Sequence, residues 1–231
     1  MVEIQYKNAK VKLGLEELVY EPAEDSFLLA DAALKELENL GKARREKAKN
    51  GKTSEIGKAE KAGQEMRILE IGTGSGFISA VLQASPFPVR VLATEINPHA
   101  ALCAKENGVE VLRADLFGGV KPAGKKRHFD LILFNPPYLP TSKEEKVPGW
   151  LNCAFDGGLS GRETLNRFLD KVGAYLSLDG EVLLLISSIT GEAEVKEKME
   201  KLGFEVESLS RKKVSFEELI VLRGRILESV L

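Results

Sequence analysis

Cysteine, histidine and tryptophan are scarce in this chain of 231 residues, which holds two, two and one of them respectively. The cysteines, Cys103 and Cys153, lie far apart and outside any Cys-x-x-Cys pattern, which argues against a disulfide framework or a structural zinc site. The histidines, His99 and His128, have no partner cluster. The sequence therefore predicts no metal site.

A surplus of positive charge and a long hydrophobic run are also missing. Thirty-three Lys and Arg against 35 Asp and Glu give a net charge of −2, so no overall basic field draws the chain to nucleic acid. No apolar run approaches the length of a membrane span, and the first twelve residues are polar and charged. With 43% hydrophobic residues the chain can bury a sizeable core. We therefore expect a cytoplasmic protein of a reducing compartment.

The most informative stretch is Asn135-Pro136-Pro137-Tyr138, which follows the apolar run 129–134. A run of this kind, stopped by two prolines, indicates a buried parallel strand that ends at an open site. The side-chain carbonyl of Asn135 and the main-chain carbonyl of Pro136 could each accept one hydrogen of a planar NH2 group, with Tyr138 packed on its plane. Such contacts would orient the nitrogen for attack on an electrophile. Taken alone, the tetrapeptide is equally compatible with a plain strand-ending turn.

A glycine turn occupies residues 72–76, between a strand pattern over 66–71 and a helical pattern over 77–83. Strand, glycine turn and helix N-terminus form the general nucleotide-binding opening. A dinucleotide fingerprint needs glycine at the sixth position of G-x-G-x-x-G, where this chain has Phe77. Glu70 stands two residues before the first glycine, where it would repel a pyrophosphate and suit an ammonium group. The spacing therefore favours S-adenosylmethionine over a nicotinamide cofactor.

Two further predicted strands lead to residues that suit an adenosyl ligand. The strand 89–93 leads to Glu95, about 20 residues past the glycines, where an acid usually binds ribose hydroxyls. The strand 109–112 ends at Asp115 and Leu116, which are placed for the adenine amino group. Because the carboxyl ends of parallel strands meet at the ligand-binding edge of an open α/β sheet, these positions indicate one site.

The N-terminal third predicts an extension and a charged insertion. Residues 2–20 indicate a short hairpin or strand, and Pro22 and the acids after it begin an amphipathic helix that runs to about Leu40. Residues 41–65 hold eight Lys or Arg against four Glu and have Ile56 as their one large apolar residue. This composition predicts a mobile loop or a solvated helical extension, with an RNA- or ribosome-touching arm as the functional alternative.

The remainder continues the alternation of strands and helices. A long polar connection over 139–160 is typical of a lid or binding loop. The patterns then predict a helix over 162–178, a strand over 181–187, a helix over 192–202 and a closing strand pair over 204–210 and 218–225. We expect one doubly wound α/β domain over 1–231, with an N-terminal extension (1–40) and the insertion (41–65). Its seven-stranded sheet would be mostly parallel, with one antiparallel strand at its C-terminal end.

The glycine turn, the two strand-end acids and the Asn-Pro-Pro-Tyr turn together resemble a class I S-adenosylmethionine-dependent methyltransferase of the amino-group branch. The segment 19–26, Val-Tyr-Glu-Pro-Ala-Glu-Asp-Ser, is similar to the HemK-related branch of archaea and eukaryotes, and so is the segment 157–163. That branch methylates the glutamine of the Gly-Gly-Gln loop in class 1 translation release factors. The resemblance covers nearly the whole chain except 41–65.

The resemblance implies S-adenosylmethionine as the cofactor, a release factor as the protein substrate, and site residues for both. The cofactor-binding residues would be Ser26, Glu70, Gly72, Gly74, Gly76, Glu95, Asp115, Leu116 and Asn135. The catalytic turn would be Asn135, Pro136, Pro137 and Tyr138. The resemblance also implies a small zinc-binding activator subunit, which would pair with the exposed edge strand 109–112.

Two other functions stay open at this point. An adenine or guanine N-methyltransferase would present an unstacked base of a nucleic acid to Tyr138, but the net charge of −2 argues against it. A non-catalytic scaffold that binds S-adenosylmethionine would have no chemical need for Asn135.

Overall fold

A seven-stranded sheet with the strand order β5-β4-β3-β6-β7-β9-β8 forms the centre of the molecule. The computed structural model describes residues 3–14, 18–50, 65–122, 129–142 and 149–227. The strands of this sheet are β3 (Met66–Ile71), β4 (Val89–Glu95), β5 (Glu110–Arg113), β6 (Phe129–Phe134), β7 (Leu176–Ser187), β8 (Phe204–Lys213) and β9 (Glu218–Ile226). β9 is antiparallel to both of its neighbours, and the pairs from β5 to β7 are parallel.

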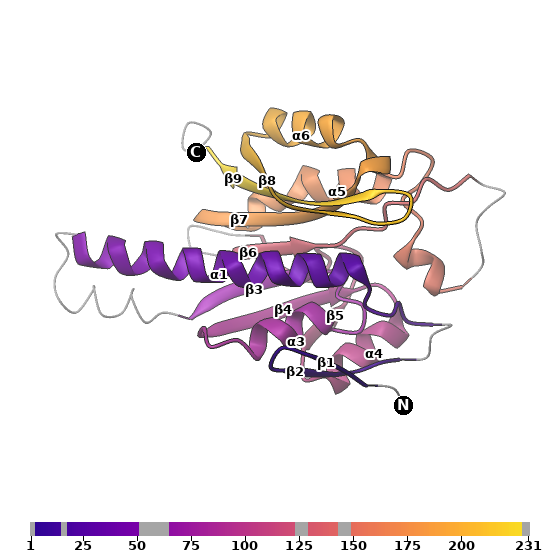
Figure 1. Ribbon diagram of the computed structural model, residues 1–231, viewed down its shortest axis with the longest axis horizontal. Coiled ribbons are helices and arrows are strands. Elements are labelled where there is room, and N and C mark those ends of the chain that lie inside the picture. The colour runs from indigo at the N-terminus through magenta and orange to yellow at the C-terminus, as the bar shows by residue number, and fades with distance from the viewer. Residues whose placement is uncertain (1–2, 15–17, 51–64, 123–128, 143–148, 228–231) are drawn as a thin grey trace.

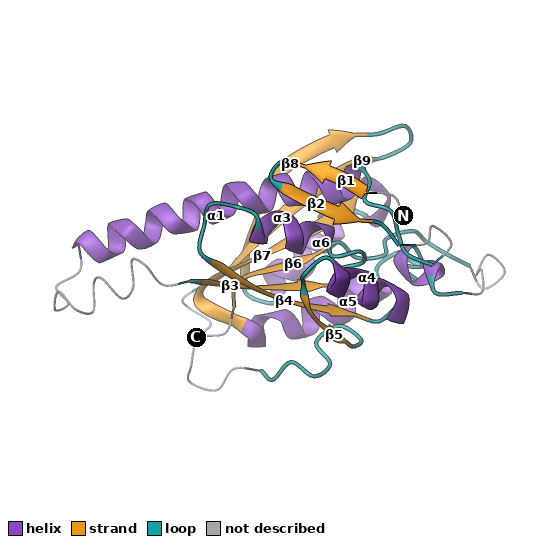
Figure 2. Cartoon of the chain, turned by 90° about the horizontal axis from the view of Figure 1, so that it is seen from below, coloured by secondary structure: helices purple, strands orange, loops and turns teal. Residues whose placement is uncertain are grey.

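Helices cover both faces of the sheet (Figure 1). α1 (Glu24–Asn50), α3 (Phe77–Gln83) and α4 (Pro98–Glu106) lie on one face, and α5 (Glu163–Val172) and α6 (Glu192–Lys201) cover the other. Short 3-10 turns are η1 (Leu151–Ala154), η2 (Gly173–Tyr175) and η3 (Ser188–Thr190). An antiparallel hairpin of β1 (Glu3–Tyr6) and β2 (Ala9–Lys12) packs beside α3 (Figure 2). The described helices include none that is both long and apolar enough to span a membrane.

The doubly wound, mostly parallel sheet is confirmed, and β6 shows why the sequence pattern identifies it. Leu131 and Leu133 enter the core on the α1 side, while Ile132 and Phe134 enter the core on the α5 side. A strand covered on both faces has no solvent side, so the residues of β6 are apolar on both faces, with Asp130 as the one exception, and do not alternate. The predicted bounds of β3, α3 and β6 match the structure.

The position of the antiparallel strand differs from the prediction, which placed it at the end of the sheet. β9 lies between β7 and β8, and β8 forms the edge. The helix predicted over 162–178 is also wrong at its C-terminal end, because α5 ends at Val172 and β7 begins at Leu176. Leu176 pairs with Phe129, and Ser177 donates a hydrogen bond to Asp130, so these residues extend the sheet.

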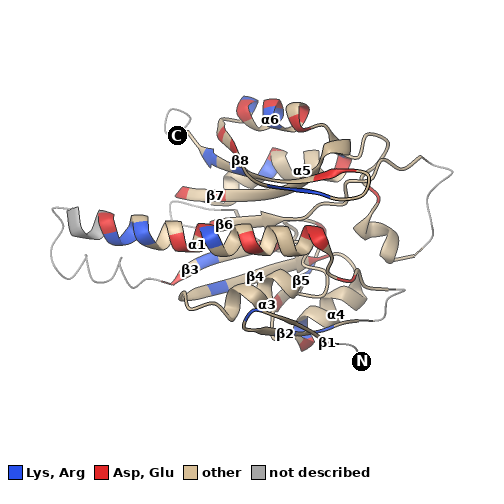
Figure 3. Cartoon of the chain, in the orientation of Figure 1, with Lys and Arg blue, Asp and Glu red and all other residues tan. Residues whose placement is uncertain are grey.

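The helix that was predicted to end near Leu40 continues to Asn50. Residues 41–50, part of the predicted charged insertion, are therefore a helical extension, and Lys and Arg gather on that half of α1 (Figure 3). Arg44 forms an ion pair with Asp130 of β6, with side chains only 18% and 7% exposed. This contact ties the extension to the sheet. Residues 51–64 lie outside the described residues.

Candidate active site

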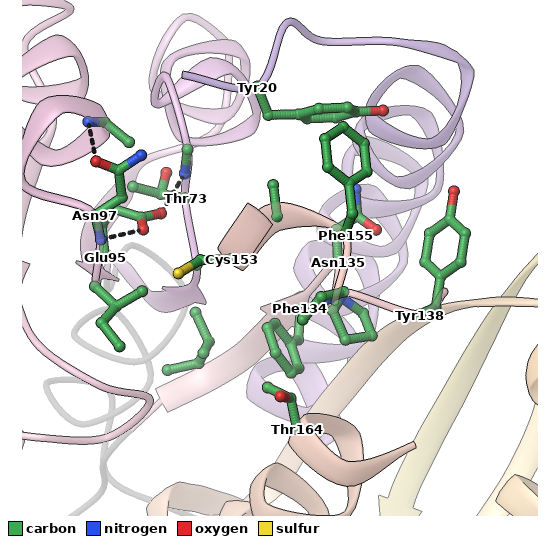
Figure 4. A pocket seen from close by; sticks show the side chains of 18 of the residues that line it. Tyr20, Thr73, Glu95, Asn97, Phe134, Asn135, Tyr138, Cys153, Phe155 and Thr164 are labelled. Carbon is green, nitrogen blue, oxygen red and sulfur yellow. Dashed lines mark hydrogen bonds between the residues drawn. The ribbon is translucent and has the colours of Figure 1, made fainter. Parts of the chain in front are cut away.

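A cavity of about 460 Å3 opens at the carboxyl ends of β3, β4 and β6. It collects residues from the segment before α1, the glycine turn, the Asn-Pro-Pro-Tyr turn, the loop around η1 and the β8–β9 turn. The predicted site residues that line it are Ser26, Glu70, Gly72, Gly74, Glu95, Asp115, Leu116, Asn135, Pro136, Pro137 and Tyr138. Figure 4 shows Thr73, Glu95 and Asn97 on one side of the cavity and Asn135 and Tyr138 on the other.

Gly76 is the one predicted residue that does not line the cavity. A Cβ atom at Gly76 would lie 2.9 Å from the Cα atom of Ala104 in α4, so this glycine allows α3 and α4 to pack closely. A Cβ atom at Gly74 would meet nothing within 4 Å, but Gly74 has a φ of +58°, which side chains rarely adopt. Gly74 thus shapes the turn, whereas Gly76 serves packing.

Glu70 ties the glycine turn to the first turn of α3. Its Oε2 atom accepts hydrogen bonds from the Thr73 hydroxyl at 2.7 Å, from the Ser79 main-chain N–H at 3.0 Å and from the Ser79 hydroxyl. The side chain is 3% exposed, and this burial raises the pKa of Glu70 to about 7. An ammonium group placed beside it would favour the ionised form.

Glu95 links β4 to the glycine turn and to α4. Its Oε2 atom accepts from the Gly74 N–H at 2.8 Å, and its Oε1 atom accepts from the Asn97 N–H at 2.8 Å. Burial raises the pKa of Glu95. The Asn97 side chain accepts from the His99 N–H at 3.0 Å and thereby caps α4. Each carboxylate oxygen of Glu95 retains a second lone pair that could accept a hydroxyl.

The two residues predicted to border the adenine, Asp115 and Leu116, differ in burial and in their contacts. Leu116 is buried and has a φ of +48°, a left-handed conformation that is uncommon for leucine. The Asp115 carboxylate forms an ion pair with Arg167 of α5, and both side chains are about half exposed. Sequence reasoning missed Arg167, which comes 52 residues later.

The charged side chains of the cavity wall are mostly acidic. The acids that line it are Asp25, Glu70, Glu95, Asp115, Asp156 and Glu217. In the described part of the chain, Arg167 is the one Lys or Arg that lines the cavity, and it pairs with Asp115. Such a wall suits a cationic nucleoside without phosphate, which is the chemistry of S-adenosylmethionine.

Asn135 is held in one orientation by Asp25. The Asn135 Nδ2 group donates a hydrogen bond of 2.9 Å to Asp25 Oδ2. Because an ionised carboxylate only accepts hydrogen bonds, this contact fixes which end of the amide is nitrogen. The Asn135 Oδ1 atom is buried and has no hydrogen-bond partner among the described residues. A buried acceptor of this kind costs about 1–3 kcal/mol unless a ligand supplies a donor.

Asp25 itself is 4% exposed and is oriented by its neighbours. The Tyr20 hydroxyl lies 3.1 Å from both of its carboxylate oxygens, and the Ser26 N–H donates to Oδ1 at 2.6 Å. Sequence reasoning assigned Asp25 only to the N-terminal end of a helix and missed its bond to Asn135, 110 residues away. The available signal was the segment 19–26, which contains both Tyr20 and Asp25.

The segment 157–163 supports the Asn-Pro-Pro-Tyr turn. The Gly157 N–H donates to the Leu139 carbonyl at 2.9 Å, and Leu139 pairs with Asp156. A Cβ atom at Gly161 would lie 2.6 Å from the Tyr138 carbonyl oxygen, so this close approach requires glycine. The connection also brings Phe155 edge-on to Tyr20, with ring centroids 5.4 Å apart. Residues 143–148 of this predicted lid lie outside the described residues.

Comparisons with known proteins identify relatives over almost the whole chain. A model of the methyltransferase small domain matches residues 56–149. The chain is 42% identical over 220 residues to a putative protein N5-glutamine methyltransferase of Methanocaldococcus jannaschii, covering 93% of this chain and 95% of that protein. It is 32% identical over 212 residues to the methyltransferase HEMK2 of Homo sapiens, covering 89% and 88%.

A solved structure agrees with these sequence matches. The structure of the Mtq2–Trm112 complex of E. cuniculi, described as responsible for methylation of the translation termination factor eRF1, matches with a TM-score of 0.62 and 26% identity. The match covers 90% of this chain and 99% of that one. The catalytic subunit mtq2 of the eRF1 methyltransferase of Schizosaccharomyces pombe is 27% identical over 224 residues, covering 89% and 88%.

Proposed function

Because this chain belongs to the protein N5-glutamine methyltransferases, the HemK-related S-adenosylmethionine-dependent enzymes, we propose that it methylates a class 1 translation release factor on the glutamine of the Gly-Gly-Gln loop. The observation that carries the proposal is the unpartnered Oδ1 atom of Asn135, buried in the cavity and oriented by Asp25. An amide NH2 group is the donor that this acceptor lacks. The names of the relatives support glutamine as the residue that brings it.

The cofactor would occupy the side of the cavity formed by β3 and β4. Glu70, Gly72 and Gly74 would hold its methionine end, and Glu95 would accept from its ribose hydroxyls. Asp115 and Leu116 would border the adenine, and Ser26 would contact the cofactor from the start of α1. When bound, S-adenosylmethionine supplies an electrophilic methyl group.

The acceptor glutamine would lie against the Asn-Pro-Pro-Tyr turn. Asn135 Oδ1 would accept one hydrogen of the side-chain NH2 group, the Pro136 carbonyl would accept the other, and Tyr138 would pack on the amide plane. Pro137 keeps the turn rigid, because proline fixes its own φ and restricts the residue before it. An amide nitrogen is a poor nucleophile, so orientation and electrostatics must supply most of the acceleration. The amide proton then leaves to water.

We also propose a small zinc-binding activator subunit that pairs along β5. β5 is an edge of the sheet, and its four residues are exposed or half-buried. An edge strand offers unpaired main-chain groups to a second chain. The solved relative from E. cuniculi is itself a complex with a second subunit, which supports the presence of a partner. An enzyme that is fully active as a monomer, without any added subunit, would contradict the proposal.

Methyl transfer from labelled S-adenosylmethionine tests the function, with wild type and Asn135→Ala measured side by side. The acceptors are a folded release factor, the same factor with its Gly-Gly-Gln glutamine replaced by alanine, and single- and double-stranded oligonucleotides. We expect label on the intact release factor alone, and a rate roughly 100- to 1,000-fold lower with Asn135→Ala. Label on the oligonucleotides alone would overturn the proposed substrate and leave the site in place.

A further inference from the structure

Besides Asn135 Oδ1, the cavity contains a second buried oxygen without a hydrogen-bond partner among the described residues. It belongs to Glu217, near the C-terminus of the sequence. Glu217 lies in the β8–β9 turn, which is closed by a 2.9 Å hydrogen bond from the Val214 N–H to the Glu217 carbonyl. Its side chain lines the cavity, and its Oε2 atom is buried without a hydrogen-bond partner among the described residues. Of the described side chains that line the cavity, Asn135 and Glu217 are the two with such an oxygen.

Glu217 lies in the part of the cavity where, in the proposed function, the acceptor glutamine would bind. Burial is the main cause of the raised pKa of Tyr138, and the carboxylates of Asp25 and Glu217 add to it. The pKa of Tyr20 is raised as well, again mainly by burial, with contributions from the carboxylates of Asp25 and Glu217. Glu217, Tyr20 and Tyr138 line the same cavity, which agrees with these contributions. The two tyrosine rings flank Asn135 (Figure 4).

The neighbouring residue Glu218 shows that this placement is specific to Glu217. Glu218 begins β9, and its Oε2 atom forms an ion pair of 3.0 Å with Arg211 of β8. Its side chain is 41% exposed. Two adjacent glutamates are thus divided between the outer surface and the cavity. Of these two, only Glu217 has an oxygen that is buried without a hydrogen-bond partner among the described residues.

We propose that Glu217 is a positioning residue for the substrate, whose free oxygen accepts a main-chain N–H of the loop that carries the acceptor glutamine. This inference rests on the proposed function. Asn135 and the Pro136 carbonyl already account for both hydrogens of the glutamine NH2 group, so Glu217 must receive a different donor. Glycines beside the glutamine would leave their N–H groups unshielded by side chains. A carboxylate is a strong acceptor for such a group.

Steady-state kinetics on the release factor, with Glu217→Ala, Glu217→Gln and the matched control Glu218→Gln, test this inference. We expect Glu217→Ala to raise KM for the release factor roughly tenfold or more, as follows from loss of a hydrogen bond to a charged group. Glu217→Gln, which keeps a neutral acceptor, should raise KM by a smaller factor. For both variants kcat and the Kd of S-adenosylmethionine should stay within about twofold, and Glu218→Gln should match wild type throughout.

The outcomes separate this inference from the proposed function. If wild type methylates the release factor and Glu217→Ala has a normal KM, the inference is overturned and the function stands. A fall in kcat at unchanged KM would also overturn it, because Glu217 would then act on the chemical step. If Glu217→Ala weakens S-adenosylmethionine binding to the same extent, a general structural role replaces the positioning role. A wild type that does not methylate the release factor overturns both proposals.

Discussion

The two sides of the cavity differ in how their buried oxygens are satisfied. On the side proposed for the methyl donor (the donor side), formed by Glu70, the glycine turn and Glu95, the protein's own N–H and hydroxyl groups bind the carboxylates. On the side proposed for the methyl acceptor (the acceptor side), formed by Asp25, Asn135 and Glu217, two buried oxygens have no partner among the described residues. The donor side is therefore organised by the chain itself, whereas the acceptor side is complete only with a ligand.

Asn135→Ala should have the largest effect, because it removes the acceptor that orients the nucleophile. We expect kcat to fall roughly 100- to 1,000-fold, as when one preorganised hydrogen-bonding group is removed from an active site. The Kd of S-adenosylmethionine should change by less than about twofold, since the donor side keeps its own bonds. Kinetics and calorimetry of the same preparation check both numbers. A parallel loss of cofactor affinity would place Asn135 on the donor side.

Asp25→Asn should have the next largest effect. The replacement carries an NH2 group of its own, so it no longer forces Asn135 to present Oδ1 to the substrate. We expect kcat to fall about 10- to 100-fold, in line with the loss of one hydrogen bond to a charged group. The neighbouring Glu24, which pairs with Lys212 on the surface, provides the matched control Glu24→Gln. Equal activity of the two variants would show that Asp25 does not set the Asn135 orientation.

The donor side was predictable from the sequence because its contacts are local. Glu70, Thr73 and Ser79 lie within ten positions of one another, and the strand and helix around them are bounded by glycines. The bounds of β6 were also predictable from local sequence, because Pro136 and Pro137 follow closely after its last residue. At α1 the local pattern left two alternatives open for the charged segment, a mobile loop or a solvated helical extension, and residues 41–50 form the extension. The helix continues, with Arg44 bound to a residue 86 positions later in the chain, Asp130 (130 − 44).

On the acceptor side, only the turn around Asn135 was predictable, because the other residues of that side come from distant parts of the sequence. The turn around Asn135 was identified because its residues are contiguous, but the acids that line the cavity beside it lie far away in the sequence. Asp25 precedes it by 110 positions, and Glu217 follows it by 82 (217 − 135). Nothing in either short segment indicates which distant side chain it meets. Those contacts exist only once α1 and the β8–β9 turn have packed against the sheet.

Glu95→Ala moves the test to the donor side. We expect S-adenosylmethionine binding to weaken by roughly 1–2 kcal/mol, because hydrogen bonds to a buried carboxylate are lost. At saturating cofactor, kcat should fall much less than for Asn135→Ala, since the acceptor side is unchanged. Calorimetric titration measures the affinity, with the exposed Glu200 of α6 giving the control Glu200→Ala. An unchanged Kd would show that the cofactor does not contact this acid.

The smallest effect concerns the proton on Glu70. Burial raises the pKa of Glu70 to about 7 in the free protein, so the carboxyl is neutral below that pH. An ammonium group favours the ionised form, which lowers the pKa on binding and releases the proton. Affinity for S-adenosylmethionine should therefore rise with pH between 6 and 8, by up to about tenfold for one proton released.

Titrations at several pH values, with Glu70→Gln as the control, isolate this contribution. The variant has no carboxyl to ionise, so whatever pH dependence it retains belongs to the cofactor or to other groups. The difference between the two curves is the part due to Glu70. If the curves are parallel, the pKa of Glu70 does not change on binding, and Glu70 serves only to hold Thr73 and Ser79. A steeper wild-type curve would show that Glu70, although hydrogen-bonded to Thr73 and Ser79, releases its proton when S-adenosylmethionine binds.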